Sequence, residues 1–246
     1  MRIAITNDDG IHGEGLLQLV RWAQKLGEVT VFAPKYEQSG KSHTIEIHKE
    51  FEVTEVPYLP GVTAYAVDSS PADCVRIAVL GMHKQFDLVL SGINKGLNIG
   101  SDIMYSGTVA AVFEAAALGI RAIAFSTEPK SINTVGQHLD RVWAFLQQHR
   151  LLEKHSIYNI NIPAQPDGIR ITRQGGPYFS DDFLPQENGM YLPRGKCVYA
   201  PSGESGLDTD AVLTHKHISI MPLTVQRTDL QVYAQLCQLR EEEACV

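Results

Sequence analysis

The sequence predicts an α/β protein with a mainly parallel sheet covered by helices on both faces. Short apolar segments alternate with segments of helical apolar spacing along the first 160 residues, a pattern typical of parallel strands joined by helices. With 246 residues, the chain is long enough for one large domain with a sizeable core. We expect the connections between parallel strands to be right-handed crossovers.

The first elements come in the order strand, helix, strand. Residues 2–7 form a short, largely apolar segment that predicts the first strand. Residues 14–25 carry apolar side chains at helical spacing, and Gly27 is suited to end that helix. Residues 29–33 predict a second, buried strand, which Pro34 ends.

The alternation continues beyond residue 70. Ser70 and Pro71 are suited to the N-cap and the first position of a helix that reaches about Met82. The segments that follow predict a strand over 86–91, an Ala-rich helix over 108–118, a strand over 122–126, a long helix over 132–149 and a strand over 157–161.

Two stretches break this alternation. Residues 44–65 alternate as β-hairpins do and include two prolines, Pro57 and Pro60. Residues 175–206 are rich in glycine, proline and aromatic side chains and have no helical period. Because a long irregular stretch in a compact domain is usually functional or packs elsewhere, the second stretch is a candidate arm.

Bulk composition argues against some classes of function. The formal net charge of −7 disfavours a broad basic surface for a nucleic acid polymer. The four cysteines show no CxxC metal spacing, and no signal peptide precedes the first strand. No apolar run approaches the roughly 20 residues that span a bilayer. We therefore expect a cytoplasmic protein with reduced thiols and no membrane contact.

The pair Asp8-Asp9 points most directly to chemistry, because it follows the first strand. Open α/β sheets bind ligands at the carboxyl ends of their strands. Two carboxylates that converge there favour a cation, and oxygen ligands favour a hard divalent ion such as Mg²⁺ or Mn²⁺. The alternative is a turn in which Asp makes local hydrogen bonds, since Asp-Asp-Gly is common in turns.

Two further oxygen donors are expected beside this pair. Ser39 follows the second strand, and Asn94 follows the strand predicted over 86–91. Since both positions lie at carboxyl ends of strands, a hydroxyl and an amide oxygen can join the two carboxylates around one divalent ion. Taken singly, Ser39 and Asn94 are more often turn residues.

Residues 91–108 are dense in Gly, Asn and Ser and lead into the Ala-rich helix. Glycines let backbone N–H groups approach an anion, and a helix N-terminus adds free donors and the positive end of its dipole. The hydroxyls of Ser106 and Thr108 can donate as well. The segment predicts a phosphate site without a basic patch, although it lacks the P-loop spacing. The alternative is an ordinary Ser or Thr N-cap.

Several motifs occur in a fixed order along nearly the whole chain. They are Asn7-Asp8-Asp9-Gly10, Ser39-Gly40, Ser70-Pro71-Ala72-Asp73-Cys74-Val75, Ser91-Gly92-Ile93-Asn94 with Gly96 and Asn98, Tyr105-Ser106-Gly107-Thr108-Val109-Ala110 with Glu114, Asn159-Ile160-Asn161-Ile162-Pro163, Thr209-Asp210-Ala211-Val212 and Ile218-Ser219-Ile220-Met221-Pro222-Leu223. Each motif alone is weak, but the ordered set resembles the SurE family, the survival-protein 5′/3′-nucleotidases of bacteria.

The resemblance implies a Rossmann-like fold in a single domain of residues 1–246. Its core spans about 1–170. An extended β-hairpin arm and a C-terminal helix, within about 171–246, are expected to exchange between the subunits of a homodimer or homotetramer.

The resemblance also assigns roles at the site. It implies that Asp8, Asp9, Ser39 and Asn94 bind one divalent metal ion per subunit. It places Ser106, Gly107 and Thr108 in a phosphate-binding turn, with Asn98 nearby.

The implied activity is metal-dependent hydrolysis of nucleoside 5′- and 3′-monophosphates. The expected nucleophile is water activated by the divalent ion, with Asp8, Asp9 and Asn94 as the catalytic set. Two other functions stay open. A phosphatase that forms an aspartyl-phosphate typically uses Asp-x-Asp rather than adjacent aspartates, and a nucleotide sensor would keep the metal site without hydrolysis.

The chain departs from the family pattern in two places. Many relatives have an Asp-Leu-Thr run after Met-Pro-Leu, where this chain has Gln226-Arg227-Thr228. A role for that Asp in protonating the leaving group therefore does not transfer. Lys41-Ser42-His43 also differs from the smaller residues often found after Ser-Gly, so the rim near the substrate is expected to differ.

Overall fold

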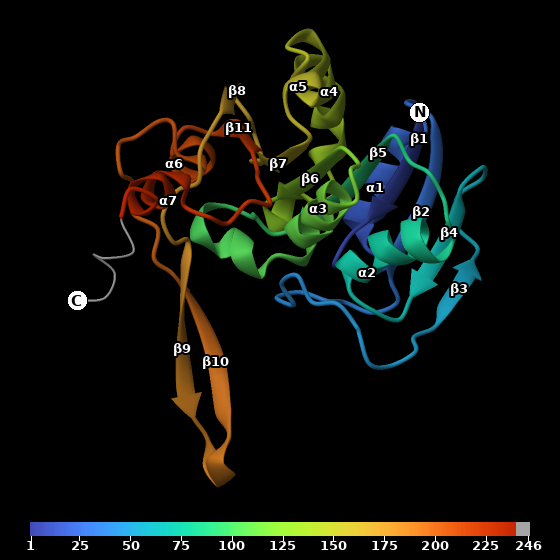
Figure 1. Ribbon diagram of the computed structural model, residues 1–246, viewed down its shortest axis with the longest axis horizontal. Coiled ribbons are helices and arrows are strands. Elements are labelled where there is room, and N and C mark those ends of the chain that lie inside the picture. Colours follow the sequence, from blue (N-terminus) through green and yellow to red (C-terminus); the bar gives the residue numbers. More distant parts are fainter. Residues whose placement is uncertain (240–246) are drawn as a thin grey trace.

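The computed structural model describes residues 1–239, in which nine strands form one sheet in the order β3-β4-β2-β1-β5-β6-β7-β11-β8 (Figure 1). These strands are β1 (Arg2–Thr6), β2 (Glu28–Pro34), β3 (Val53–Val56), β4 (Thr63–Val67), β5 (Leu88–Lys95), β6 (Ala122–Thr127), β7 (Ile157–Ile162), β8 (Gly168–Ile171) and β11 (His217–Pro222). The neighbours from β4 to β7 are all parallel. β3 is antiparallel to β4, and β11 is antiparallel to β7. The predicted mainly parallel sheet is thus confirmed.

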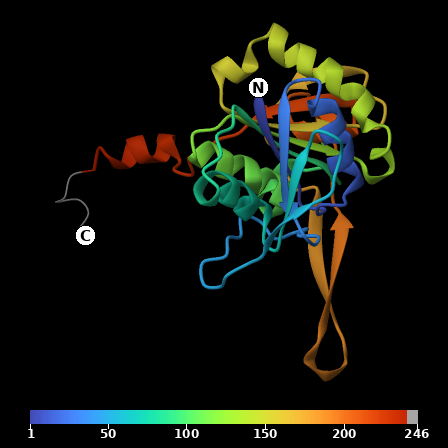
Figure 2. The same ribbon diagram turned by 90° about the vertical axis from the view of Figure 1, so that its right-hand side faces the viewer.

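Helices cover both faces of this sheet (Figures 1 and 2). They are α1 (Glu14–Ala23), α2 (Pro71–Arg76), α3 (Gly107–Ala117), α4 (Leu139–Gln148), α5 (Leu151–Lys154) and α6 (Asp208–Leu213). Ile3 and Ile5 of β1 pack in one core with Leu16 of α1. Ala4, which lies between them, packs in the opposite core with Val109 of α3. Neighbouring side chains of a strand point to opposite faces, so each strand contributes to both cores.

The order of the strands reverses beside β1. From β1 the chain moves outward through β2 to β4, and then returns to place β5 on the other side of β1, followed by β6 and β7. In open α/β sheets, such a reversal leaves a crevice at the carboxyl ends of the two central strands. The carboxyl ends of β1 and β5 therefore mark the expected ligand site.

The prediction of a long helix over 132–149 is wrong for the first half of that range. The chain there forms short 3-10 turns, η3 (Pro129–Ser131) and η4 (Val135–His138), and α4 begins only at Leu139. The side chain of Gln18 in α1 accepts the N–H of Gly136 at 3.1 Å and donates to the carbonyl of Ile132. Because α1 satisfies these backbone groups, a continuous helix is not needed to pair them.

Two other predicted elements differ in detail. The helix predicted from Ser70 to about Met82 is α2, capped by Ser70 Oγ, followed by a π-helical turn, η1 (Ile77–Gly81). The hairpin predicted within residues 44–65 is the antiparallel pair of β3 and β4.

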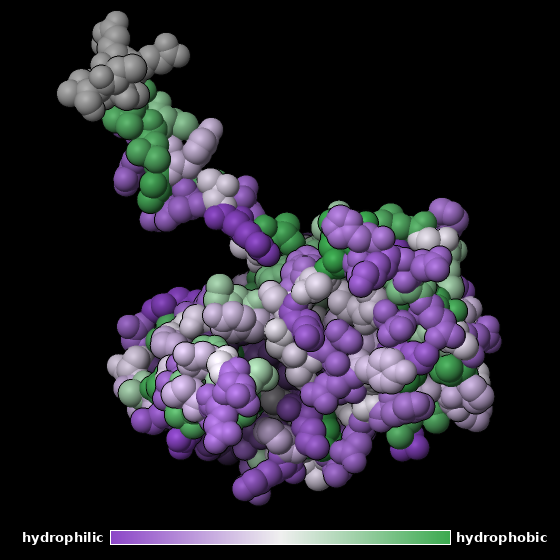
Figure 3. Space-filling model, turned by 90° about the horizontal axis from the view of Figure 1, so that it is seen from below, coloured by the Kyte–Doolittle hydropathy of each residue, from purple (hydrophilic) through white to green (hydrophobic). Residues whose placement is uncertain are grey.

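The candidate arm is a hairpin of β9 (Phe179–Pro185) and β10 (Tyr191–Cys197), joined by η5 (Glu187–Gly189) and projecting away from the sheet (Figures 1 and 2). Its base is fastened to η2 (Gly100–Tyr105), where Asp102 Oδ2 accepts the N–H groups of Tyr178 at 3.2 Å and Phe179 at 2.7 Å. The last described helix, α7 (Leu230–Leu236), also lies apart from the sheet, and apolar side chains gather on it (Figure 3). Exchange of these elements between subunits stays a prediction.

None of the described helices is both long and apolar enough to cross a membrane. Three of the four cysteines are free thiols, with Cys74 buried and Cys197 and Cys237 exposed. Burial raises the pKa of the Cys74 thiol, so that group is protonated and unreactive. Cys245 lies outside the described residues.

Candidate active site

Asp8 lies just beyond the end of β1, beneath the first turn of α3. It is only 4% exposed. Its Oδ1 accepts the hydroxyl of Thr108 at 2.5 Å, and its Oδ2 accepts the Thr108 N–H at 3.3 Å. Residue 107 is a glycine because a Cβ there would lie 3.0 Å from the Cβ of Asp8. The sequence thus brings the carboxylate directly to the positive end of α3.

Asp9 joins the end of β1 to the end of β5. Its Oδ2 accepts the N–H of Lys95 at 3.2 Å. Asn94, the residue before Lys95, donates its side-chain Nδ2 to the carbonyl of Gly96 at 2.8 Å, which orients its amide group and leaves Oδ1 as an acceptor. Asp9 and Asn94 are therefore neighbours at the switch point, as the sequence predicts.

The pKa values of both aspartates are raised. Burial raises the pKa of Asp8, and the hydrogen bonds from Thr108 oppose that rise. Burial, and then the charge of Asp8, raise the pKa of Asp9 to about 6. Two carboxylates this close favour a cation between or beside them.

Ser39 reaches the same region from the loop after β2. The N–H of Gln38 donates to the carbonyl of Asp8 at 2.8 Å, which ties this loop to the end of β1. The hydroxyl of Ser39 donates to Glu37 Oε1 at 2.7 Å. Ser39 and Asp9 line one cavity of about 410 Å³ together with Lys95. The structure thus places all four predicted metal ligands around the carboxyl ends of β1, β2 and β5.

The donor set fits a hard divalent cation. All its donors are oxygens, two of them from carboxylates, as Mg²⁺ and Mn²⁺ prefer. The part of the chain that the structure describes contains no cluster of three or more His, Cys, Asp or Glu side chains suited to a metal. The candidate set has two carboxylates, with a hydroxyl and an amide oxygen beside them. Next to the aspartates, the buried Oδ1 of Asn7 has no hydrogen-bond partner, while its Nδ2 donates to the carbonyl of Gly10 at 2.9 Å.

The predicted phosphate turn is present, but several of its polar groups already have partners. Ser106 Oγ accepts the N–H of Val109 at 3.1 Å and caps α3, as the alternative interpretation expects. Asn98 is fixed by β6 and β7, since its Nδ2 donates to Ser126 Oγ at 2.8 Å and its N–H donates to Asn161 Oδ1 at 2.8 Å. Phosphate binding by Ser106, Gly107, Thr108 and Asn98 stays a prediction.

Contacts that the sequence did not predict hold the loop beyond Ser39 through His43, Glu114 and Arg76. His43 Nε2 lies 2.9 Å from Glu114 Oε2, and Arg76 donates to Glu114 Oε1 at 3.1 Å. Ser42 adds two bonds to the end of η2, donating its N–H to the carbonyl of Tyr105 at 3.0 Å and its hydroxyl to the carbonyl of Met104 at 2.7 Å. Glu114 and His43 each belong to noted motifs, but only the fold shows that they meet.

Asp208 is a second residue that the sequence did not identify. It is fully buried and accepts the N–H groups of Gly100 at 2.9 Å and Gly175 at 2.7 Å. It therefore joins the start of η2 to the segment that leads into the hairpin. Gln226, at the first departure from the family pattern, is exposed and accepts the N–H of Thr228 at 3.0 Å through its own side chain.

The fold and the site define a class of protein: Rossmann-like α/β proteins that hold paired carboxylates at the switch point of the sheet. The family model described as "Survival protein SurE" matches residues 3–181, and the chain belongs to the SurE family.

Individual relatives agree with this membership. The chain is 38% identical over 245 residues to a protein of Herpetosiphon aurantiacus named 5′-nucleotidase SurE, with 94% of each chain covered. It is 39% identical to a protein of the same name from Carboxydothermus hydrogenoformans, covering 98% of this chain and 95% of the relative. The crystal structure of SurE protein from Aquifex aeolicus superposes with a TM-score of 0.79 at 28% identity, covering 96% of this chain and 98% of that one.

Proposed function

We propose that this protein is a metal-dependent phosphomonoesterase that hydrolyses nucleoside 5′- and 3′-monophosphates to nucleoside and phosphate. The observation that carries the proposal is that Asp8 and Asp9 lie at the switch point, with Asp8 hydrogen-bonded to the first turn of α3 and Asp9 to the end of β5. This arrangement offers a cation site and an anion site side by side, which is what a phosphate monoester needs. Relatives named 5′-nucleotidase support the choice of substrate.

Asp8, Asp9, Ser39 and Asn94 would hold one Mg²⁺ or Mn²⁺ ion per subunit. When bound, such an ion would lower the pKa of a water molecule and polarise a phosphate oxygen. Thr108 fixes the orientation of Asp8 from both carboxylate oxygens, and each of these oxygens keeps a further lone pair for a ligand. The N–H of Lys95 likewise orients the side chain of Asp9 through one of its carboxylate oxygens.

The remaining chemistry falls to groups of the chain itself. Asp9 is less buried than Asp8 and faces the cavity, so it is the carboxylate suited to orient an attacking water and accept its proton. The start of α3 directs its dipole at the phosphate and favours the negative charge that develops on the phosphate oxygens.

The contacts of Asp8 argue against this residue as the nucleophile of the aspartyl-phosphate alternative. A nucleophilic carboxylate must reach the phosphorus atom, whereas Asp8 is 4% exposed and bound to Thr108 through both oxygens. The alternative of a sensor without hydrolysis differs from our proposal in one observable, because a sensor binds nucleotide and releases no phosphate.

A phosphate-release screen tests the proposal. Purine and pyrimidine 5′- and 3′-monophosphates are incubated with the protein in the presence of Mn²⁺ or Mg²⁺ and again with a chelator. We expect release from both classes of monophosphate, only with metal. Nucleotide binding without release would support the sensor, and a phosphorylated protein trapped by acid quenching would support the aspartyl-phosphate route.

We also infer a cytoplasmic homodimer or homotetramer. Phe183, Met190 and Tyr191 on the hairpin are 60%, 65% and 64% exposed, and Leu230 and Tyr233 on α7 are 61% and 58% exposed. Exposed apolar side chains concentrated on two projecting elements are typical of contact surfaces between subunits.

A further inference from the structure

We propose that the cavity between the base of the hairpin and η2 binds the nucleobase of the substrate, an inference that rests on the proposed function. This cavity, called here the base cavity, has a volume of about 590 Å³. Its walls include Gly40, Tyr105 and Phe179. The volume lies within the roughly 300–1,000 Å³ of small-molecule sites.

The base cavity adjoins both halves of the candidate active site. Gly40 directly follows the predicted metal ligand Ser39, and Tyr105 directly precedes Ser106 in the predicted phosphate turn. The two walls are held together by Ser42, whose N–H and hydroxyl bind the carbonyls of Tyr105 and Met104. In this proposal the phosphate lies at the start of α3, and the nucleoside extends past Tyr105 into the cavity.

Two aromatic side chains from different elements contribute to the walls. Tyr105, at the end of η2, is 56% exposed, and Phe179, at the start of β9, is 46% exposed. The N–H of Phe179 donates to Asp102 Oδ2 at 2.7 Å, which fixes the backbone at the start of β9 against η2. Flat apolar rings that border one cavity are suited to stack on a nucleobase, whose own faces are flat and polarisable.

The charge of the base cavity disfavours phosphate in it. Asp102 and Asp181 line the cavity, and among its described lining residues there is no Lys or Arg. An additional phosphate group would meet two carboxylates without a compensating cation. The cavity therefore suits the uncharged end of a nucleoside monophosphate.

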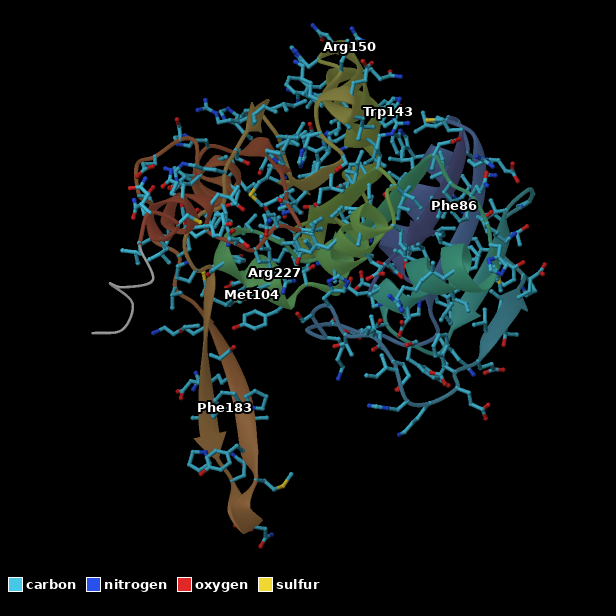
Figure 4. All side chains as sticks on the ribbon, viewed as in Figure 1. Phe86, Met104, Trp143, Arg150, Phe183 and Arg227 are labelled. Carbon is cyan, nitrogen blue, oxygen red and sulfur yellow. The ribbon has the colours of Figure 1, made fainter. Side chains whose placement is uncertain are left out.

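A neighbouring cavity of about 380 Å³ is the competing position. It is lined by His43, Ser106 and Arg227 but does not include Ser39 or Gly40. Figure 4 places Met104 and Arg227 close to the point where the hairpin leaves the body, and Phe183 farther out along the same hairpin. A substitution of Arg227 therefore tests the competing cavity. A substitution of Phe183 tests the part of the hairpin that lines neither cavity.

The test compares a substrate with a base against one without. Values of kcat/KM are measured for AMP and for ribose 5-phosphate with wild type, Phe179→Ala, Tyr105→Ala and Tyr105→Phe. We expect the two alanine variants to lower kcat/KM for AMP roughly 5- to 150-fold, the usual range for loss of one stacking ring, and to change it less than twofold for ribose 5-phosphate. Tyr105→Phe keeps the ring and should keep the wild-type ratio of the two values.

Phe183→Ala is the matched control, because Phe183 lies on the same face of β9 as Phe179 and does not line the cavity. Its ratio of AMP to ribose 5-phosphate should equal that of wild type. Equal losses on both substrates in Phe179→Ala would overturn the proposal. So would a larger change of the ratio in Arg227→Ala than in Phe179→Ala.

A second measurement separates this proposal from the proposed function. If wild type releases phosphate from neither substrate, calorimetric titration with adenosine still tests the base cavity. Weaker adenosine binding in Phe179→Ala, with unchanged binding in Phe183→Ala, supports a base site even without hydrolysis. No binding to wild type, or equal affinity in all three proteins, refutes it.

Discussion

Thr108 donates hydrogen bonds to both carboxylate oxygens of Asp8, from its hydroxyl to Oδ1 at 2.5 Å and from its N–H to Oδ2 at 3.3 Å. These residues are 100 positions apart in the chain, and both are buried. The contact fixes the end of β1 against the first turn of α3. The same two residues therefore connect the predicted metal site with the predicted phosphate turn. Thr108 is thus placed to position Asp8, whether or not its hydroxyl also reaches a phosphate.

Thr108→Ala should therefore weaken both metal binding and turnover. Losing a hydrogen bond to a buried carboxylate costs roughly 1.5–3 kcal/mol, which corresponds to about a 10- to 150-fold loss of kcat/KM if all of it falls on the site. Thr108→Ser keeps the hydroxyl and should recover most of the activity. Calorimetric titration with Mn²⁺ and steady-state kinetics check both parts. A variant with normal metal affinity and kinetics but a lower Tm would show that Thr108 only stabilises the start of α3.

Asp9→Asn should not lower the thermal stability of the metal-free protein, but it should reduce the stabilisation that Mn²⁺ gives. In the metal-free protein the change removes one of two close negative charges, so the Tm should rise or stay the same. With millimolar Mn²⁺, wild type should gain stability because the ion binds only the folded state, whereas the variant should gain little. Thermal unfolding with and without Mn²⁺ measures both effects. An equal metal-induced rise of Tm in the two proteins would remove Asp9 from the ligand set.

The charge of Glu114 should increase the free energy of unfolding at neutral pH, and this contribution should be lost in acid. Its pKa is lowered, chiefly by the hydrogen bond from His43 and then by Arg76. Because the native pKa lies below the unfolded value of about 4.3, the stabilisation is complete above that value and disappears as the pH falls through the native pKa. Glu114→Gln should thus lose roughly 1–2 kcal/mol at pH 7, a figure reduced because His43 and Arg76 are partly open to solvent.

Urea unfolding at pH 7, 5 and 3 measures this difference. The gap between wild type and Glu114→Gln should close at the lowest pH. Glu153→Gln is the control, since Glu153 forms an exposed pair with Arg150 and should change stability little at any pH. A gap for Glu114→Gln that is the same at all three pH values would contradict the role assigned to its charge.

The hairpin should hold the protein in an oligomer. Deleting residues 176–205 removes β9, β10 and their exposed aromatic side chains but leaves every strand of the main sheet. Light scattering should show a homodimer or homotetramer for the full chain and a smaller species for the deletion. A full-length monomer would end this part of the account, as would an oligomer that the deletion leaves unchanged.

The sequence was sufficient for features that depend on near neighbours. Strand β1 and the Asp8-Asp9 pair at its end follow from an apolar run that stops at a polar turn, and Ser70 caps α2 as its position before a proline predicts. The paired positions at the ends of β1 and β5 follow from the general behaviour of parallel sheets.

Features that depend on distant residues could not be read in the same way. The helix predicted from residue 132 starts at Leu139 because Gln18, on another helix, satisfies the intervening backbone. Asp208 is 108 residues from Gly100, whose N–H it accepts, and no local pattern marks that contact. The partners of Asp8 and Glu114 likewise appear only when the chain is folded.

The most direct measurement of the central claim is the initial rate of phosphate release from AMP as Mn²⁺ is added back to chelator-treated protein, with wild type and Asp9→Asn side by side. The account predicts no release by metal-free wild type, a saturable rise with added Mn²⁺, and a rate near background for a folded Asp9→Asn at every concentration. Full activity of metal-free wild type, or a normal response of Asp9→Asn, would contradict a metal-dependent phosphomonoesterase site at the carboxyl ends of β1 and β5.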